Sequence, residues 1–278
     1  MPIHDQGYKR YGGRRTALGR AWWIIARTQL VAALRYRPFV VLLLFAWAPF
    51  VVRAVQIYLS TSFEQVAMLA ATSRMFREFI DQQSLFVFLV TIALAGSIAD
   101  DRRANALQLY LSKPLTRVEY IIGRLVPVLA CLLGVTFVPA VLLLALQVAF
   151  SGSTTFLQQN LFLLPAITLV SLVQALLSAC AMLALSSLTK SRRFVSVMYA
   201  GIIFFTAAMY QALRSITGSR AWAAISPGDM MDVIADAVFR IRAQPTVPVP
   251  VAALVVALII GASIWILERR IRGVEIVT

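Results

Sequence analysis

Six long apolar runs, separated by shorter polar or charged stretches, form the dominant pattern of this chain. A helix needs about 20 consecutive apolar residues to cross the hydrocarbon core of a bilayer. The second run is short, and we expect its helix to begin upstream, near Arg77. The pattern predicts an all-α, polytopic membrane protein with six transmembrane helices, at Pro38–Leu59, Ser84–Ala99, Leu125–Phe150, Leu161–Leu188, Phe194–Leu213 and Pro248–Leu267.

The residues before the first run predict a separate amphipathic helix. Residues 1–37 hold a polar, basic tail and then a helical stretch from Thr16 to Arg37, with two tryptophans among its arginines. At about 100° per residue, Trp22 and Ile25 share one arc of this helix and Arg27 lies nearly opposite. We expect an interfacial helix on the cytoplasmic leaflet. A basic topology anchor without a further role is the alternative.

Basic residues flank the apolar runs unevenly, and this sets the orientation of the membrane domain, residues 38–278. Cytoplasmic loops of membrane proteins carry an excess of Lys and Arg. With the N-terminus in the cytoplasm, 19 of the 26 basic residues lie on the cytoplasmic side. Six spans then place both termini in the cytoplasm. The other side keeps Arg53, Arg74, Arg77, Arg214, Arg220, Arg240 and Arg242.

Composition excludes a water-soluble domain. Of the 278 residues, 60% are hydrophobic and 14% are charged, and the mean hydropathy is +0.81. A soluble domain of this composition would expose an apolar surface. The net charge of +14 comes from clusters at the ends of the apolar runs, as membrane topology requires, so we expect no nucleic-acid partner. The polar N-terminus lacks the apolar stretch that is typical of a cleavable signal peptide.

The loop at residues 214–247, on the non-cytoplasmic side, predicts an outer amphipathic helix. Ser226, Pro227 and Asp229 form a typical helix start, with a capping hydroxyl, a proline in the first turn and an acid after it. One arc of this helix is apolar. The opposite arc is expected to be a solvated face, which we favour over a cation site, and it collects Asp229, Asp232, Asp236 and Arg240. Asp236 and Arg240 are spaced to pair one turn apart.

A charged island, Ser97–Tyr120, lies between the second and third runs on the predicted cytoplasmic side, and its loop covers residues 100–117. Its two acids suit the first turn of a new helix, and a short leucine-rich helix then ends before a proline. Such a helix is suited to dock into the groove of a partner protein. A hairpin that lies on the membrane with its leucines in lipid is the alternative. The candidate docking residues are Asp100, Asp101, Arg102, Arg103, Leu107, Leu111, Lys113 and Pro114.

The island ends in a sequence that predicts a helix start. In Thr116-Arg117-Val118-Glu119, the threonine is placed to cap the helix and the glutamate to reach back to the cap, which is a capping box. We therefore expect Glu119 to have a capping role and not a catalytic one. The box begins the helix that leads into the third run.

The chain lacks the residues that several kinds of catalysis need. His4 is the only histidine and lies in the polar tail, which argues against Ser-His catalysis and His-based metal sites. The three lysines are Lys9, Lys113 and Lys190, and none follows a glycine, so a G-K-[ST] phosphate loop is missing. We therefore predict that the chain is not an enzyme, and we expect no metal site.

The island resembles the segment after the second span of ABC-2-type permeases, the membrane subunits of type V ABC exporters. Gly96–Arg103 match the small residues, acid and basic pair of that segment, Leu107–Pro114 match its leucine-rich helix and proline turn, and Arg117–Tyr120 match its R-x-E-Y sequence. The plan of an interfacial helix, six spans and outer helices before the last span is also similar. Within the family, the chain most resembles permeases of the nitrous-oxide-reductase accessory type.

The resemblance implies a permease of an ATP-driven exporter in the bacterial plasma (inner) membrane, energised by two copies of a separate ABC ATPase subunit. It implies a second permease copy, most simply in a homodimer, and a coupling helix from Asp100 to Pro114 that docks on the ATPase. ATP and Mg would bind to the ATPase, and no cofactor is expected in this chain. A non-transporting six-span scaffold that anchors a partner complex is the alternative.

Overall fold

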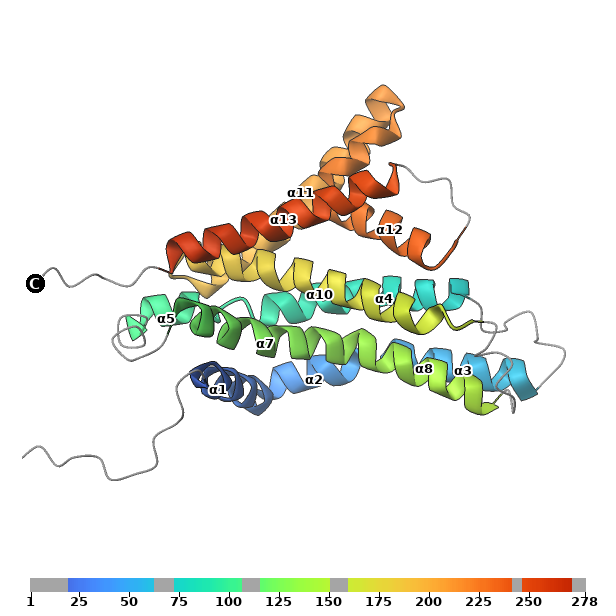
Figure 1. The fold of residues 1–278 in the computed structure, drawn as a ribbon, viewed down its shortest axis with the longest axis horizontal. Coiled ribbons are helices and arrows are strands. Elements are labelled where there is room, and N and C mark those ends of the chain that lie inside the picture. The colour runs from blue at the N-terminus through green and yellow to red at the C-terminus, as the bar shows by residue number, and fades with distance from the viewer. Residues whose placement is uncertain (1–19, 63–72, 107–115, 151–159, 242–246, 272–278) are drawn as a thin grey trace, which may run out of the picture.

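A computed structural model describes residues 20–62, 73–106, 116–150, 160–241 and 247–271. Within these ranges all regular elements are helices, and most of the long ones run along a common axis (Figure 1). The elements in chain order are α1 (Ala21–Arg35), α2 (Arg37–Phe45), α3 (Ala48–Ser62), α4 (Ser73–Ala93), α5 (Ala99–Arg103), α7 (Arg117–Val135), α8 (Phe137–Phe150), α10 (Leu163–Leu188), α11 (Arg192–Thr217), η2 (Arg220–Ile225), α12 (Pro227–Val238) and α13 (Val249–Arg270).

Five helical segments of the described chain are long and apolar enough to cross a membrane, which confirms five of the predicted spans in outline. The remaining prediction, Ser84–Ala99, corresponds to α4. The first half of α4 carries Arg74, Arg77, Glu78 and Asp81, and this helix is not among the five. The five segments are Arg37–Ser60, Arg117–Phe150, Leu163–Leu188, Arg192–Thr217 and Val249–Arg270.

Two of these segments are broken just before a proline. The first run forms α2 and α3, which are separated at Ala46 and Trp47, and Pro49 follows. Proline removes one backbone N–H, and its ring clashes with the carbonyl four residues earlier, so it kinks a helix. The third run is divided between α7 and α8 at Thr136, shortly before Pro139.

The bounds of α4 differ most from prediction. This helix begins well upstream of Ser84, as expected, but it ends at Ala93 and not at Ala99. Residues 94–98 form a turn, and α5 begins after it. Gly96 lies in this turn, where a Cβ atom would come within 2.8 Å of the Arg192 side chain. The absence of a Cβ therefore lets the start of α11 approach the turn.

The predicted interfacial helix is confirmed as a helix, α1, although it covers Ala21–Arg35 and not the full stretch from Thr16 to Arg37. Figure 1 shows α1 nearly end-on at the α5 end of the bundle, while α7 runs across the view, so α1 crosses the bundle axis. Its contact with α7 is close at Gly123. A Cβ atom there would lie 2.9 Å from Ile25 Cβ and 3.0 Å from the Trp22 carbonyl oxygen.

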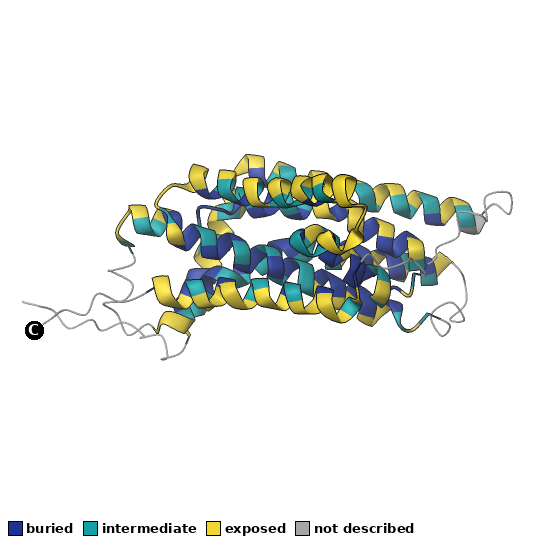
Figure 2. Ribbon diagram, turned by 90° about the horizontal axis from the view of Figure 1, so that it is seen from above, coloured by how far each residue is buried: buried dark blue, intermediate teal, exposed yellow. Residues whose placement is uncertain are grey.

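The buried residues form two clusters along the bundle. One joins α3, α4, α8, α10, α11, η2, α12 and α13 around Phe76 and Phe79, and the other joins α1, α2, α4, α5, α7, α10, α11 and α13 around Tyr120 and Leu132. The helices α4, α10, α11 and α13 contribute to both clusters. Figure 2 shows the buried residues along the middle of the bundle and the exposed ones on its outer faces. Many of the exposed residues are large and apolar, such as Phe205 and Leu258, as expected for a surface that faces lipid.

We predict that Gly123→Ala destabilises the protein by about 1–3 kcal/mol, because the added methyl group would overlap α1. Gly134→Ala on the same helix is the matched control, since a Cβ there meets nothing within 4 Å. That control should gain up to about 1 kcal/mol from the higher helix propensity of alanine. Thermal unfolding of both variants in detergent measures the difference. Equal effects of the same sign would contradict the close packing of α1 on α7.

Candidate functional site

The described part of the predicted docking segment forms α5 and the turn after it. Asp100, Asp101, Arg102 and Arg103 all lie on α5, with the two acids in its first turn as predicted. Asp100 and Arg103 are exposed, whereas Asp101 and Arg102 are partly buried. The other predicted docking residues, Leu107, Leu111, Lys113 and Pro114, lie outside the described residues.

Asp101 is bonded inside the protein, to the start of α7. Its carboxylate accepts a hydrogen bond from the Tyr120 hydroxyl at 2.6 Å and forms an ion pair with Arg124. The same Arg124 guanidinium donates to Gln29 Oε1 on α1 at 3.2 Å. Both charged side chains are largely buried, at 15% and 10% exposure. This cluster, defined here as the Asp101 cluster, joins α1, α5 and α7 at one end of the bundle.

The turn before α5 is held by one hydroxyl from another helix. Ser186 Oγ on α10 accepts hydrogen bonds from the backbone N–H groups of Ile98 at 3.2 Å and Ala99 at 2.9 Å, and donates to the Ala95 carbonyl at 2.8 Å. The Ser186 hydroxyl therefore supplies hydrogen-bond partners to three backbone groups at a place where the helical hydrogen bonds are interrupted.

Two arginines add further bonds across this end of the bundle. Arg102 of α5 donates to the Ser187 carbonyl oxygen of α10, and Arg192 of α11 donates to the Ala93 carbonyl oxygen at the end of α4. Together with Ser186, these bonds connect the α5 turn to the adjoining ends of α10 and α11. We call this set of contacts the α5 junction.

A hollow of about 260 Å³ lies beside the α5 junction. Asp100, Asp101 and Arg124 line it together with polar and small residues of α1 and the turn. The hollow is therefore lined by charged side chains, one of which, Asp100, is exposed at the surface of α5. Docking of a partner protein at this surface stays a prediction.

The predicted capping box is confirmed. The Glu119 backbone N–H donates to Thr116 Oγ1 at 3.2 Å, and the Thr116 N–H donates to Glu119 Oε2 at 2.9 Å. The side chain of Glu119 is thus engaged at the first turn of α7. This agrees with a structural role for both residues.

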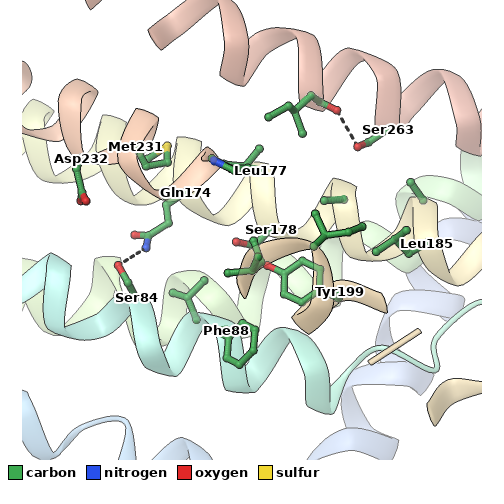
Figure 3. Close-up of a pocket in the computed structure, with 18 of the residues that line it drawn as sticks. Ser84, Phe88, Gln174, Leu177, Ser178, Leu185, Tyr199, Met231, Asp232 and Ser263 are labelled. Atoms are coloured by element: carbon green, nitrogen blue, oxygen red, sulfur yellow. Dashed lines mark hydrogen bonds between the residues drawn. The ribbon is translucent and has the colours of Figure 1, made fainter. Parts of the chain in front are cut away.

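A cavity of about 360 Å³ lies between α4, α10, α11, α12 and α13. Its wall along α10 reaches from Gln174 to Leu188, which is about 21 Å of helix. Figure 3 shows Asp232 at one end of the cavity and Leu185 at the other. Most of the lining is apolar, including Val87, Leu177 and Ile203.

A few polar and aromatic groups interrupt this apolar lining. Gln174 donates to Ser84 Oγ at 2.8 Å, and its own Oε1 atom is buried with no hydrogen-bond partner in the described structure. Deeper in the cavity, Tyr199 lies beside Ser178 (Figure 3). The ring of Tyr199 stacks with that of Phe88, with the centroids 5.9 Å apart.

The acidic face of α12 lies against an arginine of α4, which corrects the expectation of a simply solvated face. Arg77 donates to Asp236 Oδ1 and to Asp232 Oδ1, both at 2.7 Å, and lies 3.6 Å from Asp81. Asp236 therefore pairs with α4 and not with Arg240 as expected. The guanidinium of Arg240 instead lies over the Phe162 ring, 4.5 Å from its centroid.

The helix start of α12 is confirmed, and its end is earlier than predicted. Ser226 Oγ accepts from the Asp229 N–H at 3.4 Å, with Pro227 in the first turn. The helix ends at Val238, because Arg240 adopts a left-handed φ of 57°. Sequence reasoning missed the partner of the acids, because Arg77 lies on another helix more than 150 residues away in the chain, and no local signal points to it.

The described residues contain no group of three or more histidine, cysteine or acidic side chains placed to hold a metal ion. Cys131 and Cys180 are both buried and free. The arrangement holds an apolar cavity with an acidic end and, at the opposite end of the bundle, a polar junction.

Comparison with protein-family models and with curated proteins found no match for this chain. The resemblance to ABC-2-type permeases therefore depends on the residues of the island and on the helical plan.

We predict that Asp101→Asn destabilises the isolated protein by about 3 kcal/mol, because it leaves the buried Arg124 charge without its counter-ion. Asp100→Asn, one residue away and exposed, should change stability by less than about 0.5 kcal/mol. Thermal unfolding in detergent compares the two. Similar small effects for both would show that the Asp101 cluster does not hold α5 on α7.

We also predict a pH-dependent contribution from Asp232. Desolvation by the surrounding protein, with about half of the side chain still exposed, raises the pKa of Asp232 from 3.8 to about 6, assisted by Asp81 and Asp229 and opposed by Arg77. The folded protein therefore binds this proton more readily than the unfolded chain, so the contribution of this group to stability is lost as the pH rises through about 6. The unfolding temperature of Asp232→Asn relative to the parent should thus rise between about pH 4 and about pH 7. A fall over that range would mean that attraction by Arg77 outweighs burial.

Proposed function

We propose that this chain is the membrane-spanning permease subunit of an ATP-driven exporter, energised by a separate ABC ATPase. One observation supports the proposal most strongly. The α5 junction, at the surface where the ATPase would dock, is bonded to α10 and α11, and these two helices also line the large cavity. A force on α5 would therefore reach the cavity wall through a few short contacts.

The path from the junction to the cavity is continuous. Ser186 and Ser187 bind the α5 turn, and Leu185 and Leu188, their neighbours on α10, line the cavity. Arg192 binds the end of α4, and the same helix α11 places Tyr199 in the cavity two turns later. Helices move as stiff rods, so displacement of either helix end would change the shape of the cavity.

We propose α4 as the sixth span. It lies within the bundle, in contact with α7, α10 and α11, and its charged half packs against α12. Within this half, Arg77 is 11% exposed and paired with Asp232 and Asp236, and a charge in a membrane segment is tolerated when it faces the protein interior and is paired, whereas Arg74, Glu78 and Asp81 are exposed. Six spans would place α1 and the end of α13 on one side, which we assign to the cytoplasm of a bacterial plasma membrane.

The exposed apolar surface supports a membrane location and leaves room for a second permease. Val52, Phe204, Phe205 and Leu258 are each more than half exposed. Lipid would cover these side chains, and part of the same surface would contact the second copy in the proposed homodimer. Two ATPase subunits would then bind the paired α5 surfaces, with ATP and Mg on the ATPase.

A cargo-free experiment separates the permease from the alternative scaffold. We replace Cys131 and Cys180 by alanine, introduce Ser178→Cys in the cavity, and co-purify the permease with the ATPase encoded beside it. Labelling of the new cysteine by a maleimide should change at least about threefold when ATP is added, because the cavity changes shape. A scaffold would bind the ATPase without any change in labelling.

Two further variants test the route of coupling. Ser186→Ala should abolish most of the ATP-dependent change while the ATPase still co-purifies, because the α5 turn loses its bonds to α10. Ser215→Ala is the control, since that hydroxyl bonds only within its own helix. Leu107→Ala combined with Leu111→Ala should instead reduce co-purification. An unchanged response in Ser186→Ala would contradict the proposed route.

A further inference from the structure

The charges at the mouth of the large cavity have one sign. Of the residues that line it, Asp81 and Asp232 are the only charged ones, and both are acidic. Their side chains are 62% and 53% exposed, so they are open to an incoming molecule. This is unexpected in a chain whose net charge is +14.

The nearby arginine does not cancel this negative charge. Arg77 is shared among Asp81, Asp232 and Asp236, so three carboxylates face one guanidinium. The guanidinium is 11% exposed and does not line the cavity. The mouth therefore carries a net negative charge toward the cavity, with Asp229 one turn away on the same helix adding to it.

The interior of the cavity suits an apolar body. Apolar side chains from α4, α10, α11, α12 and α13 form most of its wall. The polar groups are few and partly used: Gln174 donates to Ser84, and the Ser263 hydroxyl donates to the Ile259 carbonyl. A sugar or a peptide would need many more hydrogen-bonding partners than this lining offers.

An aromatic pair lies deeper in the cavity than the two acids. Phe88 and Tyr199 stack on each other and line the wall, and Phe88 lies about two helical turns beyond Asp81 on α4. Aromatic rings offer apolar surface to the body of a ligand, and a π face attracts positive charge. Together with the acidic mouth, the pair favours a cation over an anion or a neutral sugar.

We propose that this cavity binds apolar organic cations, with the positive charge held near Asp81 and Asp232, and the apolar body against the Phe88–Tyr199 pair and against α10, α11 and α13. Such molecules are then the cargo class of the exporter, and this step rests on the proposed function. Electrostatic attraction selects the sign of the charge, and burial of apolar surface supplies most of the affinity.

A matched pair of ions tests the proposal on the purified full-length chain in detergent, without any ATPase. Tetraphenylphosphonium and tetraphenylborate have nearly the same shape and apolar surface but opposite charge. We expect the cation to raise the unfolding temperature in a saturable way and the anion to have no specific effect. Equal stabilisation by both ions would overturn the charge selection.

Three variants locate the bound cation. Asp81→Asn and Asp232→Asn should each lower the apparent affinity for tetraphenylphosphonium about five- to tenfold, since each removes one attracting charge. Glu78→Gln is the control on the same helix as Asp81, because Glu78 pairs with Arg53 and Arg74 away from the cavity. Ala181→Phe should abolish binding by filling the space.

The outcomes separate this proposal from the proposed function. Unchanged affinity in the double variant Asp81→Asn with Asp232→Asn, or in Ala181→Phe, would overturn the cation site, while ATP-dependent labelling of the cavity would still support a permease. Conversely, cation binding without any ATP-dependent change would support the site and contradict the exporter.

Discussion

The structure depends on one constraint: backbone groups inside an apolar bundle must find hydrogen-bond partners, because neither lipid nor apolar side chains supply any. Within an unbroken helix the backbone groups bond to one another, so partners from outside the helix are needed only where a helix is broken. At the kink between α2 and α3, the Ala46 carbonyl accepts from the buried Gln83 side chain of α4 at 3.1 Å. At the turn before α5, Ser186 of α10 serves three backbone groups. These two breaks are thus stabilised by a polar side chain from a neighbouring helix, and each bond ties two helices together at a fixed position along the bundle.

The same constraint explains why the spans were predictable from the sequence and why their bounds were less so. Length and hydropathy determine whether a helix can cross a bilayer, and both are local properties. The starts of α7 and α12 were also predictable, because the capping residues Thr116 and Ser226 act within one turn. By contrast, the end of α4 was predicted too late, at Ala99 and not at Ala93, although its start upstream of Ser84 was expected. The turn that follows this helix is held by Ser186, which is almost ninety residues away in the chain.

The partners of the charged side chains in the candidate sites were even harder to predict from the sequence, because they too lie far apart in the chain. Arg77 meets Asp232 and Asp236 across more than 150 residues, and no periodicity within either helix reveals that contact. The sequence placed the acids on one face of α12, which is right, but the choice between water and a partner depends on which helix packs there. Asp101 is similar. Its position at a helix start was predictable, whereas its burial against Arg124 and Tyr120 follows from the way in which α7 and α1 approach each other at Gly123.

These contacts divide the molecule into two ends of different chemistry that share α4, α10 and α11. At one end, the α5 junction is polar, tightly bonded and close to a surface that still exposes Asp100 and Arg103. At the other, the Arg77 network holds α12 over an apolar cavity whose mouth is acidic. A rigid junction transmits displacement well. The cavity is bounded by α11 and α13, and the outer faces of these helices are largely exposed. Few side chains therefore pack behind the cavity wall to resist a change in its shape. Motion that enters at α5 would therefore be expressed at the cavity, because that is where the bundle is least filled.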